Sequence, residues 1–227
     1  MVSRPIKDPE SLELQPPDLE IMVLRIHYRC SEAMTLPRWK GALFRGGLGR
    51  ALKQTFCDRA CIAGAACVRT VSCPYATIFA PEQDQSMARS LNGVRDVPRP
   101  FVVRPPLHEQ MAFVVGDILT FDVVVIGSAA AYVQHLIGAF TNLGAMGLGQ
   151  ERKHATITLV EQVHPLTKAV HTVLEHGVLY APTPTCSSAS VFAVAPYLPT
   201  TLHLHMLTPT RVKHAGCLLY TSDAADE

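Results

Sequence analysis

Residues 118–160 constrain the fold of this chain more than any other stretch. Residues 118–126 are dense in β-branched and aromatic side chains, which predicts a buried strand. A helix should follow, because Val133, Leu136, Ile137 and Phe140 recur at helical spacing. Gly144 is expected just past the end of that helix, and the alternating residues 155–160 predict a second strand. The stretch is therefore a strand, a helix and a strand joined by short connections.

The connection between this helix and the second strand is rich in glycine. It contains Gly144, Gly147 and Gly149, followed by Arg152, Lys153 and His154. Glycines let a ligand approach the backbone closely, and the neighbouring cations suit phosphate. The glycines follow a helix and lack the phosphate-loop spacing, which argues against a nucleotide cofactor. A tight turn that binds nothing is the alternative interpretation.

The N-terminal part predicts a strand over residues 19–28 and a helix that begins near Pro37. Phe44, Leu48, Ala51 and Leu52 form the apolar stripe of this helix. Three glycines, Gly46, Gly47 and Gly49, interrupt it, and each costs about 1 kcal/mol relative to alanine in a helix interior. Such a helix should need close approach of its backbone, either to the sheet or to a ligand.

Positive charge is concentrated in this same region, although the formal net charge of the whole chain is only +1. Between residues 25 and 53 the single acid is Glu32, while the cations are Arg25, Arg29, Arg38, Lys40, Arg45, Arg50 and Lys53. A solvated helix face is one explanation. Solvated faces usually mix the two signs of charge, however, so the lack of acids favours a polyanionic partner.

Four cysteines, Cys57, Cys61, Cys67 and Cys73, fall within a short insertion over residues 57–79. Four thiolates can hold a structural zinc ion or an iron–sulfur cluster, and a closed site of this kind leaves no position for a substrate. The spacings are looser than in paired Cys-x-x-Cys motifs. Four partly buried thiols without metal are the alternative.

Length and composition favour one or two globular domains, with 227 residues of which 48% are hydrophobic. The longest apolar stretch, residues 111–133, contains Asp117 and Asp122 and should not span a bilayer. Residues 1–17 lack the apolar core of a secretory signal, so we expect a cytoplasmic protein with no membrane partner.

The predicted elements run β-α-β-β-α-β, with the cysteine insertion after the first helix. This is the order of the α+β, ferredoxin-like fold, which RNA-recognition modules also use. We expect a flexible lead-in over residues 1–18, a ferredoxin-like domain over 19–165, and the start of a second, incomplete ferredoxin-like domain over 166–216, including a strand at 201–207. Residues 217–227 resemble a translated transposase-derived sequencing adapter, so we expect a non-native tail there.

Several motifs in this order resemble the CRISPR-associated RAMP superfamily. They are residues 37–52, 73–79, 99–106, 116–121, 143–149 with Arg152, and 208–213. Within this superfamily the motifs most resemble those of the endoribonuclease that processes precursor CRISPR RNA. The resemblance implies tandem ferredoxin-like domains, and a glycine-rich loop that touches RNA backbone.

The resemblance also implies RNA cleavage without a metal or other cofactor. A general base would activate a ribose 2′-OH for attack on the adjacent phosphate, and the product would be a cyclic phosphate. His27, Tyr28 and Lys53 are the candidate catalytic residues. Arg45, Arg50, Gly147, Gly149, Arg152 and Lys153 are the candidate RNA-binding residues. An incomplete second domain would leave the chain inactive.

Two further hypotheses compete with the endoribonuclease. The first is a non-catalytic RAMP subunit that holds guide RNA among other CRISPR effector subunits. The second is a metal-stabilised interaction domain without an RNA role. Loss of RNA binding on reversing the charge of Arg45 and Arg152 would argue against the latter.

Overall fold

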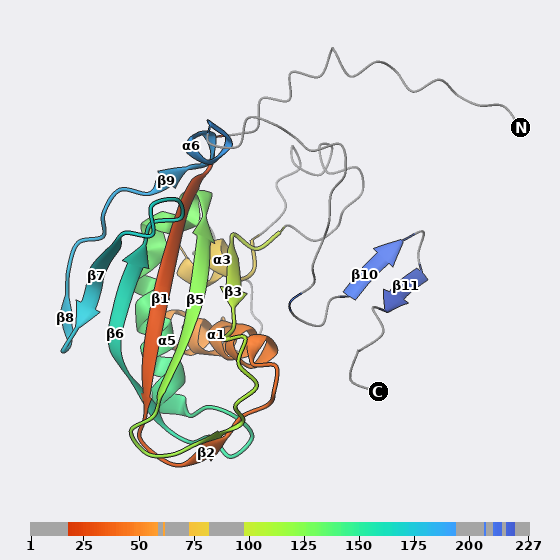
Figure 1. The fold of residues 1–227 in the computed structure, drawn as a ribbon, viewed down its shortest axis with the longest axis vertical. Helices are drawn as coiled ribbons and strands as arrows, with labels where there is room; N and C mark the ends of the chain where they lie inside the picture. Colours follow the sequence, from red (N-terminus) through yellow and green to blue (C-terminus); the bar gives the residue numbers. More distant parts are fainter. Residues whose placement is uncertain are drawn as a thin grey trace, which may run out of the picture.

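The structure is a computed structural model that describes residues 18–58, 61, 73–81, 98–193, 207, 211–214 and 217–220. Its centre is an antiparallel sheet with two long helices behind it (Figure 1). Apolar residues alternate along the central strands, because one face of each strand is buried. This alternation was recognisable in the sequence.

Four strands lie side by side in the sheet: β1 (Glu20–Cys30), β3 (Phe101–Arg104), β5 (Ile118–Ile126) and β6 (Ala155–Val163). They lie in the order β3-β5-β1-β6, and each neighbouring pair is antiparallel. With α1 (Gly41–Phe56) after β1 and α5 (Val133–Met146) after β5, the molecule has the α+β class that the sequence predicts. The arrangement is compatible with a ferredoxin-like fold.

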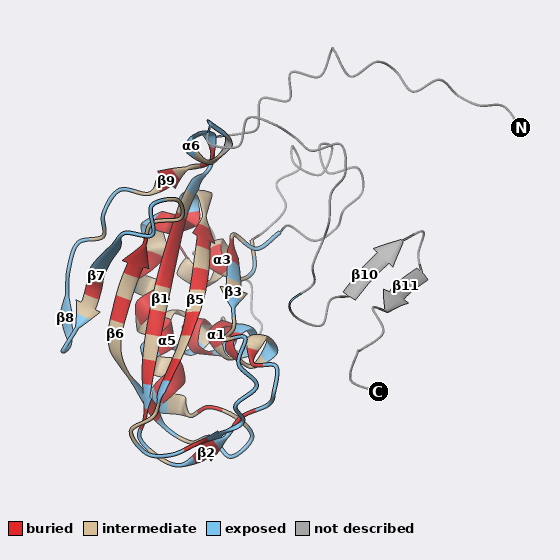
Figure 2. Ribbon diagram, in the orientation of Figure 1, coloured by how far each residue is buried: buried red, intermediate tan, exposed pale blue. Residues whose placement is uncertain are grey.

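Both helices bury their apolar faces against one side of the sheet. Leu24, Ile26 and Tyr28 point from β1 into this core, and they meet Phe44 of α1 and Phe121 of β5. The rings of Phe44 and Phe121 stack with their centroids 3.9 Å apart. Buried and half-buried residues alternate along β5, so its other face is left uncovered by the two helices (Figure 2).

Shorter elements complete the described part of the chain. A 3-10 helix, η2 (Gly127–Tyr132), leads into α5, and α3 (Pro74–Ile78) packs on α1. Two short strands, β2 (Met34–Thr35) and β4 (Ala112–Phe113), pair with each other, as do β10 (Arg211–His214) and β11 (Cys217–Tyr220). None of the described helices combines the length and apolar character that crossing a bilayer requires.

The sheet continues past residue 165, where the sequence predicted a new domain. β7 (Val170–Glu175) pairs with β6, and β8 (Val178–Leu179) pairs with β7. β9 (Cys186–Ser187) pairs with the start of β1, and α6 (Ser188–Ala193) follows it. These three strands belong to the first sheet, because each of them pairs with a strand of that sheet. A second domain after α6 stays a prediction, and the strand expected over 201–207 lies outside the described residues except for Leu207.

The second helix is longer than the sequence predicted, since α5 continues through Gly144 and ends at Met146. A Cβ atom at Gly144 would lie 2.3 Å from the carbonyl oxygen of Ala155 in β6. Gly144 therefore lets the helix touch the strand, and Gly147 ends the helix instead. Gly147 has a φ of 91°, a conformation that glycine adopts without strain.

Candidate nucleic-acid interface

The glycines of α1 serve the packing of this helix on its neighbours. A Cβ atom at Gly47 would lie 2.6 Å from Leu143 of α5, and one at Gly49 would lie 2.3 Å from the ring of Phe79. Gly46 has open space around it. At Gly47 and Gly49 the helix backbone therefore comes close to protein side chains, as one of the two explanations expected from the sequence.

The glycine-rich segment after α5 folds into a tight hairpin. The backbone N–H of Leu148 donates to the carbonyl of Lys153 over 2.8 Å, and the reverse bond measures 3.1 Å. Arg152 occupies the left-handed region with a φ of 51°. Because these two backbone hydrogen bonds join the ends of the hairpin, the segment has a defined shape next to the end of α5.

The hairpin and α1 line the same cleft, which has a volume of about 480 Å³. Gly47 and Arg50 contribute from α1, while Gly147 and Gly149 contribute from the other wall. The two segments that the sequence marked as suited to phosphate therefore lie side by side. The cleft also has an apolar part, to which Leu36, Pro37 and Leu143 contribute.

The remaining predicted RNA-binding side chains do not line the cleft. Arg45 and Arg152 are exposed. The Nζ atom of Lys153 lies 4.0 Å from a carboxylate oxygen of Glu32, which partly neutralises the lysine charge. The backbone N–H of His154 donates to the Glu32 carboxylate, which lowers the pKa of Glu32, and the charges of His154 and Lys153 act in the same direction. Arg50 is the exposed cation that lines the cleft, and the exposed acid Glu151 lines it as well.

The basic stretch recognised in the sequence does not form one surface. Lys40 is buried, and its Nζ donates to the carbonyl of Arg38 over 3.3 Å. Burial lowers the pKa of Lys40. Arg38 pairs with Glu109, and Arg25 pairs with Asp122. These acids come from distant parts of the chain, which is why a count of charges along the sequence missed them.

The three predicted catalytic residues are not brought together. Neighbouring residues of a strand point to opposite faces, so the His27 side chain lies on the uncovered face of the sheet while Tyr28 points into the core. Tyr28 is fully buried, and its hydroxyl donates to the carbonyl of Phe140 in α5. Lys53 lies on α1, which packs on the core side of the sheet. A common catalytic centre of these three side chains is inconsistent with this arrangement.

The burial of Tyr28 predicts a loss of stability at high pH. Burial raises the pKa of Tyr28 well above the value of 10.0 that holds for an exposed tyrosine. The folded protein then keeps the proton where the unfolded chain releases it, so folding is favoured less as pH rises. Above about pH 10 this tyrosine lowers the free energy of unfolding by up to about 1.4 kcal/mol per pH unit. Urea unfolding at several pH values measures the slope, and Tyr28→Phe should reduce it. An unchanged slope would contradict the buried, neutral tyrosine.

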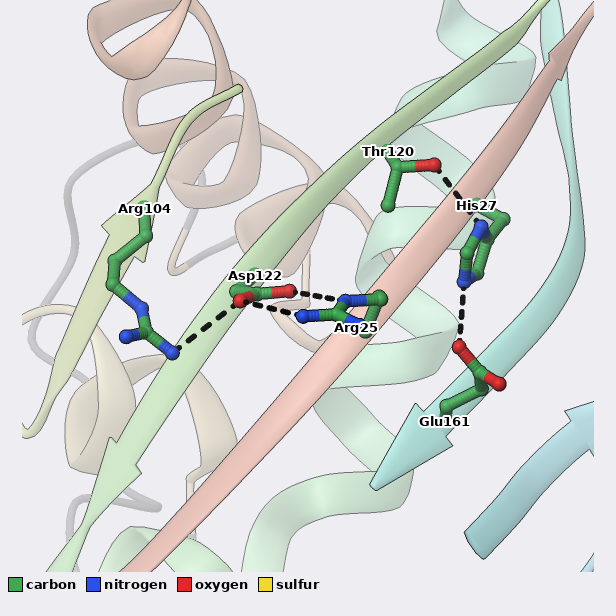
Figure 3. A network of polar contacts seen from close by, with 6 residues as sticks. All are labelled: Arg25, His27, Arg104, Thr120, Asp122 and Glu161. Atoms are coloured by element: carbon green, nitrogen blue, oxygen red, sulfur yellow. Dashed lines mark hydrogen bonds and ion pairs between the residues drawn. The ribbon is translucent and has the colours of Figure 1, made fainter. Parts of the chain in front are cut away.

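A network of polar side chains crosses the uncovered face of the sheet (Figure 3). Arg25 donates from Nε and Nη2 to the two carboxylate oxygens of Asp122, over 2.9 and 3.4 Å, and Arg104 reaches the same carboxylate over 3.3 Å. The hydrogen bond to Asp122 raises the pKa of Arg25. A second group holds His27, whose Nε2 lies 2.9 Å from Glu161 and whose Nδ1 lies 3.0 Å from Thr120.

The partners in this network were not predictable from the sequence. Alternation along β1 places Arg25 and His27 on one face, and this was recognisable. Asp122 and Glu161 become their neighbours only through the register of β5 and β6 on β1. That register depends on contacts far apart in the chain, which no local pattern shows.

Three of the four predicted metal-binding cysteines come close together. Burial raises the pKa of Cys57 to about 12, and hydrogen bonds and charge from its neighbours Cys61 and Cys73 act in the same direction. Cys67 lies outside the described residues. No cluster of three or more histidine, cysteine or acidic side chains with the arrangement of a metal site occurs in the described part of the chain. A zinc ion or iron–sulfur cluster bound by Cys57, Cys61, Cys67 and Cys73 therefore stays a prediction.

This prediction can be tested by elemental analysis. We expect the purified full chain to carry zinc or iron, and Cys57→Ser to lower the metal content because one thiolate ligand is lost. Cys186→Ser is the matched control, since Cys186 is a buried thiol in β9 rather than in the insertion. A wild-type protein that contains neither metal would rule the site out.

Comparison with known proteins shows the relationship of the chain. A family model described as AF_1859_N: N-terminal domain matches residues 19–185. The search of curated proteins gives no match. A solved structure described as the Csm3-Csm4 subcomplex in the type III-A CRISPR-Cas interference complex is similar to 65% of this chain and 81% of its own, with 15% sequence identity and a TM-score of 0.38. The family match spans β1 to the loop before β9, so this chain belongs to the family described as AF_1859_N, N-terminal domain.

Proposed function

We propose that this protein is an RNA-binding RAMP subunit of a CRISPR effector complex, which holds guide RNA without cutting it. The cleft between α1 and the glycine hairpin would receive the ribose-phosphate backbone. The observation that carries the proposal is the joint lining of this cleft by Arg50, Gly147 and Gly149.

The chemistry of the cleft supports a backbone ligand. Arg50 offers a planar fork of donors that matches phosphate oxygens. Gly147 and Gly149 contribute to the wall of the cleft. Their missing side chains serve packing, because a Cβ atom at Gly147 would lie 2.1 Å from the carbonyl oxygen of Arg152. The apolar contribution of Leu36, Pro37 and Leu143 suits the sugar and the face of a base. The motifs of this chain resemble those of RAMP proteins in their order. We therefore expect the ligand of the cleft to be CRISPR RNA.

The endoribonuclease hypothesis has less support than this subunit. Tyr28 is fully buried and cannot reach a substrate. The His27 side chain lies on the uncovered face of the sheet, whereas Lys53 belongs to α1 on the other face. These three side chains do not form the set of acid and base groups around one phosphate that 2′-OH attack requires for its proton transfers.

One experiment distinguishes the two functions. The full chain is mixed with labelled, single-stranded CRISPR repeat RNA in EDTA, and both binding and RNA length are followed. We expect binding that weakens steeply as salt rises, because phosphate contacts release counterions, and we expect intact RNA. RNA fragments that end in a cyclic phosphate would instead support the endoribonuclease. Absence of RNA binding would refute both and favour the interaction domain.

A further inference from the structure

A second concave surface lies on the uncovered face of the sheet, away from the cleft of the proposed function. We call it the sheet groove, and its volume is about 760 Å³. Side chains of β1, β3 and β5 form it, among them Arg25, His27, Arg104, Thr120 and Asp122. None of these residues lines the cleft between α1 and the glycine hairpin.

Two arginines and one carboxylate line the sheet groove, and a second carboxylate, Glu161, lies beside it in contact with His27. Two arginines, Arg25 and Arg104, share the single carboxylate of Asp122 (Figure 3). Arg25 donates to this carboxylate from two nitrogens, whereas Arg104 makes a single contact with it, of 3.3 Å. The side chain of Arg104 is 54% exposed. Most of the Arg104 guanidinium donors are therefore directed to solvent, which suits a phosphate oxygen.

The rim of the sheet groove is apolar. Val102, Pro105, Pro106 and Leu107 contribute to it, and Val102 and Leu107 are 50% and 56% exposed. Exposed apolar side chains next to unsatisfied guanidinium donors form an amphipathic surface. A nucleotide has the same two parts, with a charged phosphate and a base whose faces are apolar.

His27 contributes a third feature. Contacts with Thr120 and Glu161 at its two ring nitrogens hold the imidazole in one orientation, and its side chain is 19% exposed. A ring held in this way gives the sheet groove a wall of fixed shape.

We propose that the sheet groove binds one nucleotide unit of single-stranded RNA, with the phosphate on Arg104 and Arg25 and the base against residues 105–107. The identity of the strand rests on the proposed function, in which the same RNA occupies the cleft. A competing occupant is a segment of this chain, because Leu207 also lines the sheet groove.

The test combines affinity with a map of contacts. Single-stranded RNA that contains 4-thiouridine is bound to the full chain, and crosslinked peptides are identified after irradiation. Affinities are then measured for Arg104→Gln, for Arg104→Lys, and for Arg29→Gln as the matched control. Arg29 is an exposed arginine of the same sheet that lines neither concave surface. Arg104→Gln should fold normally, because Arg25 still covers the Asp122 carboxylate.

We expect crosslinks in residues 102–107, and an affinity loss of about tenfold for Arg104→Gln, as expected for one charged hydrogen bond. Arg104→Lys should lose less, and Arg29→Gln should lose least. Equal small losses for Arg104→Gln and Arg29→Gln, without crosslinks at 102–107, would overturn the sheet groove as an RNA site and favour the chain's own segment there.

The crosslinks separate this inference from the proposed function. Crosslinks at residues 147–153 alone would support the cleft as an RNA site and refute the sheet groove. Crosslinks at residues 102–107 alone would support the sheet groove and refute the cleft. Crosslinks at neither segment would refute both.

Discussion

Arg50→Glu is expected to weaken binding of single-stranded RNA by about tenfold or more at physiological salt, since a charged hydrogen bond contributes about 1.5–3 kcal/mol. Arg50 is the exposed cation that lines the cleft, so a glutamate there would repel the phosphate that the arginine attracts. The salt dependence should also become shallower, by about 0.7 in the logarithmic slope for each lost phosphate contact. Fluorescence anisotropy at several salt concentrations measures both quantities.

Arg29→Glu provides the matched control for this prediction. It reverses the same charge at an exposed arginine of β1 that does not line the cleft. If RNA responds only to the overall charge of the protein, both variants will lose the same affinity. An equal loss would therefore contradict a specific contact with Arg50.

Gly144→Ala is expected to lower the free energy of unfolding by about 3 kcal/mol, at the upper end of the usual cost of overpacking. The new methyl group would lie 2.3 Å from the carbonyl oxygen of Ala155 and 2.9 Å from the ring of Tyr28. A backbone carbonyl in a central strand cannot rotate away as a flexible side chain can. The helix would have to move away from β6, which loosens the core where Tyr28 packs.

Gly138→Ala is the control within the same helix. The nearest atom to a Cβ at Gly138 belongs to the Phe56 ring at 3.9 Å, an ordinary contact distance. Alanine is a better helix former, so this variant should be more stable than wild type by about 0.5–1 kcal/mol. Thermal or urea unfolding of the two variants gives the comparison. Similar stabilities would mean that α5 does not touch β6 at Gly144.

The order and class of the main elements were predictable from the sequence, because their periodicities are local. The strand at residues 118–126 and the apolar stripe of the helix after it needed no knowledge of distant residues. The end of that helix was misjudged, since Gly144 is typical of a helix end and only its distance to Ala155 explains its place inside α5. The pairing of β7 with β6 was not predictable for a related reason, because tertiary contacts set it.

The candidate site was predictable in part. Clusters of glycine and arginine marked both walls of the cleft before their proximity was known. His27 and Tyr28 do not meet, because neighbours on a strand face opposite sides. Asp122 and Glu161, the partners of Arg25 and His27, have no local signal, since only strand register brings them across the sheet.

The most direct test of the shared cleft is hydrogen exchange of the full chain with and without single-stranded RNA. The account predicts that RNA slows amide exchange in residues 35–50 and in residues 147–153 together, because one ligand covers both walls. Slower exchange in only one of the two segments, or in neither, while RNA is bound, would contradict it.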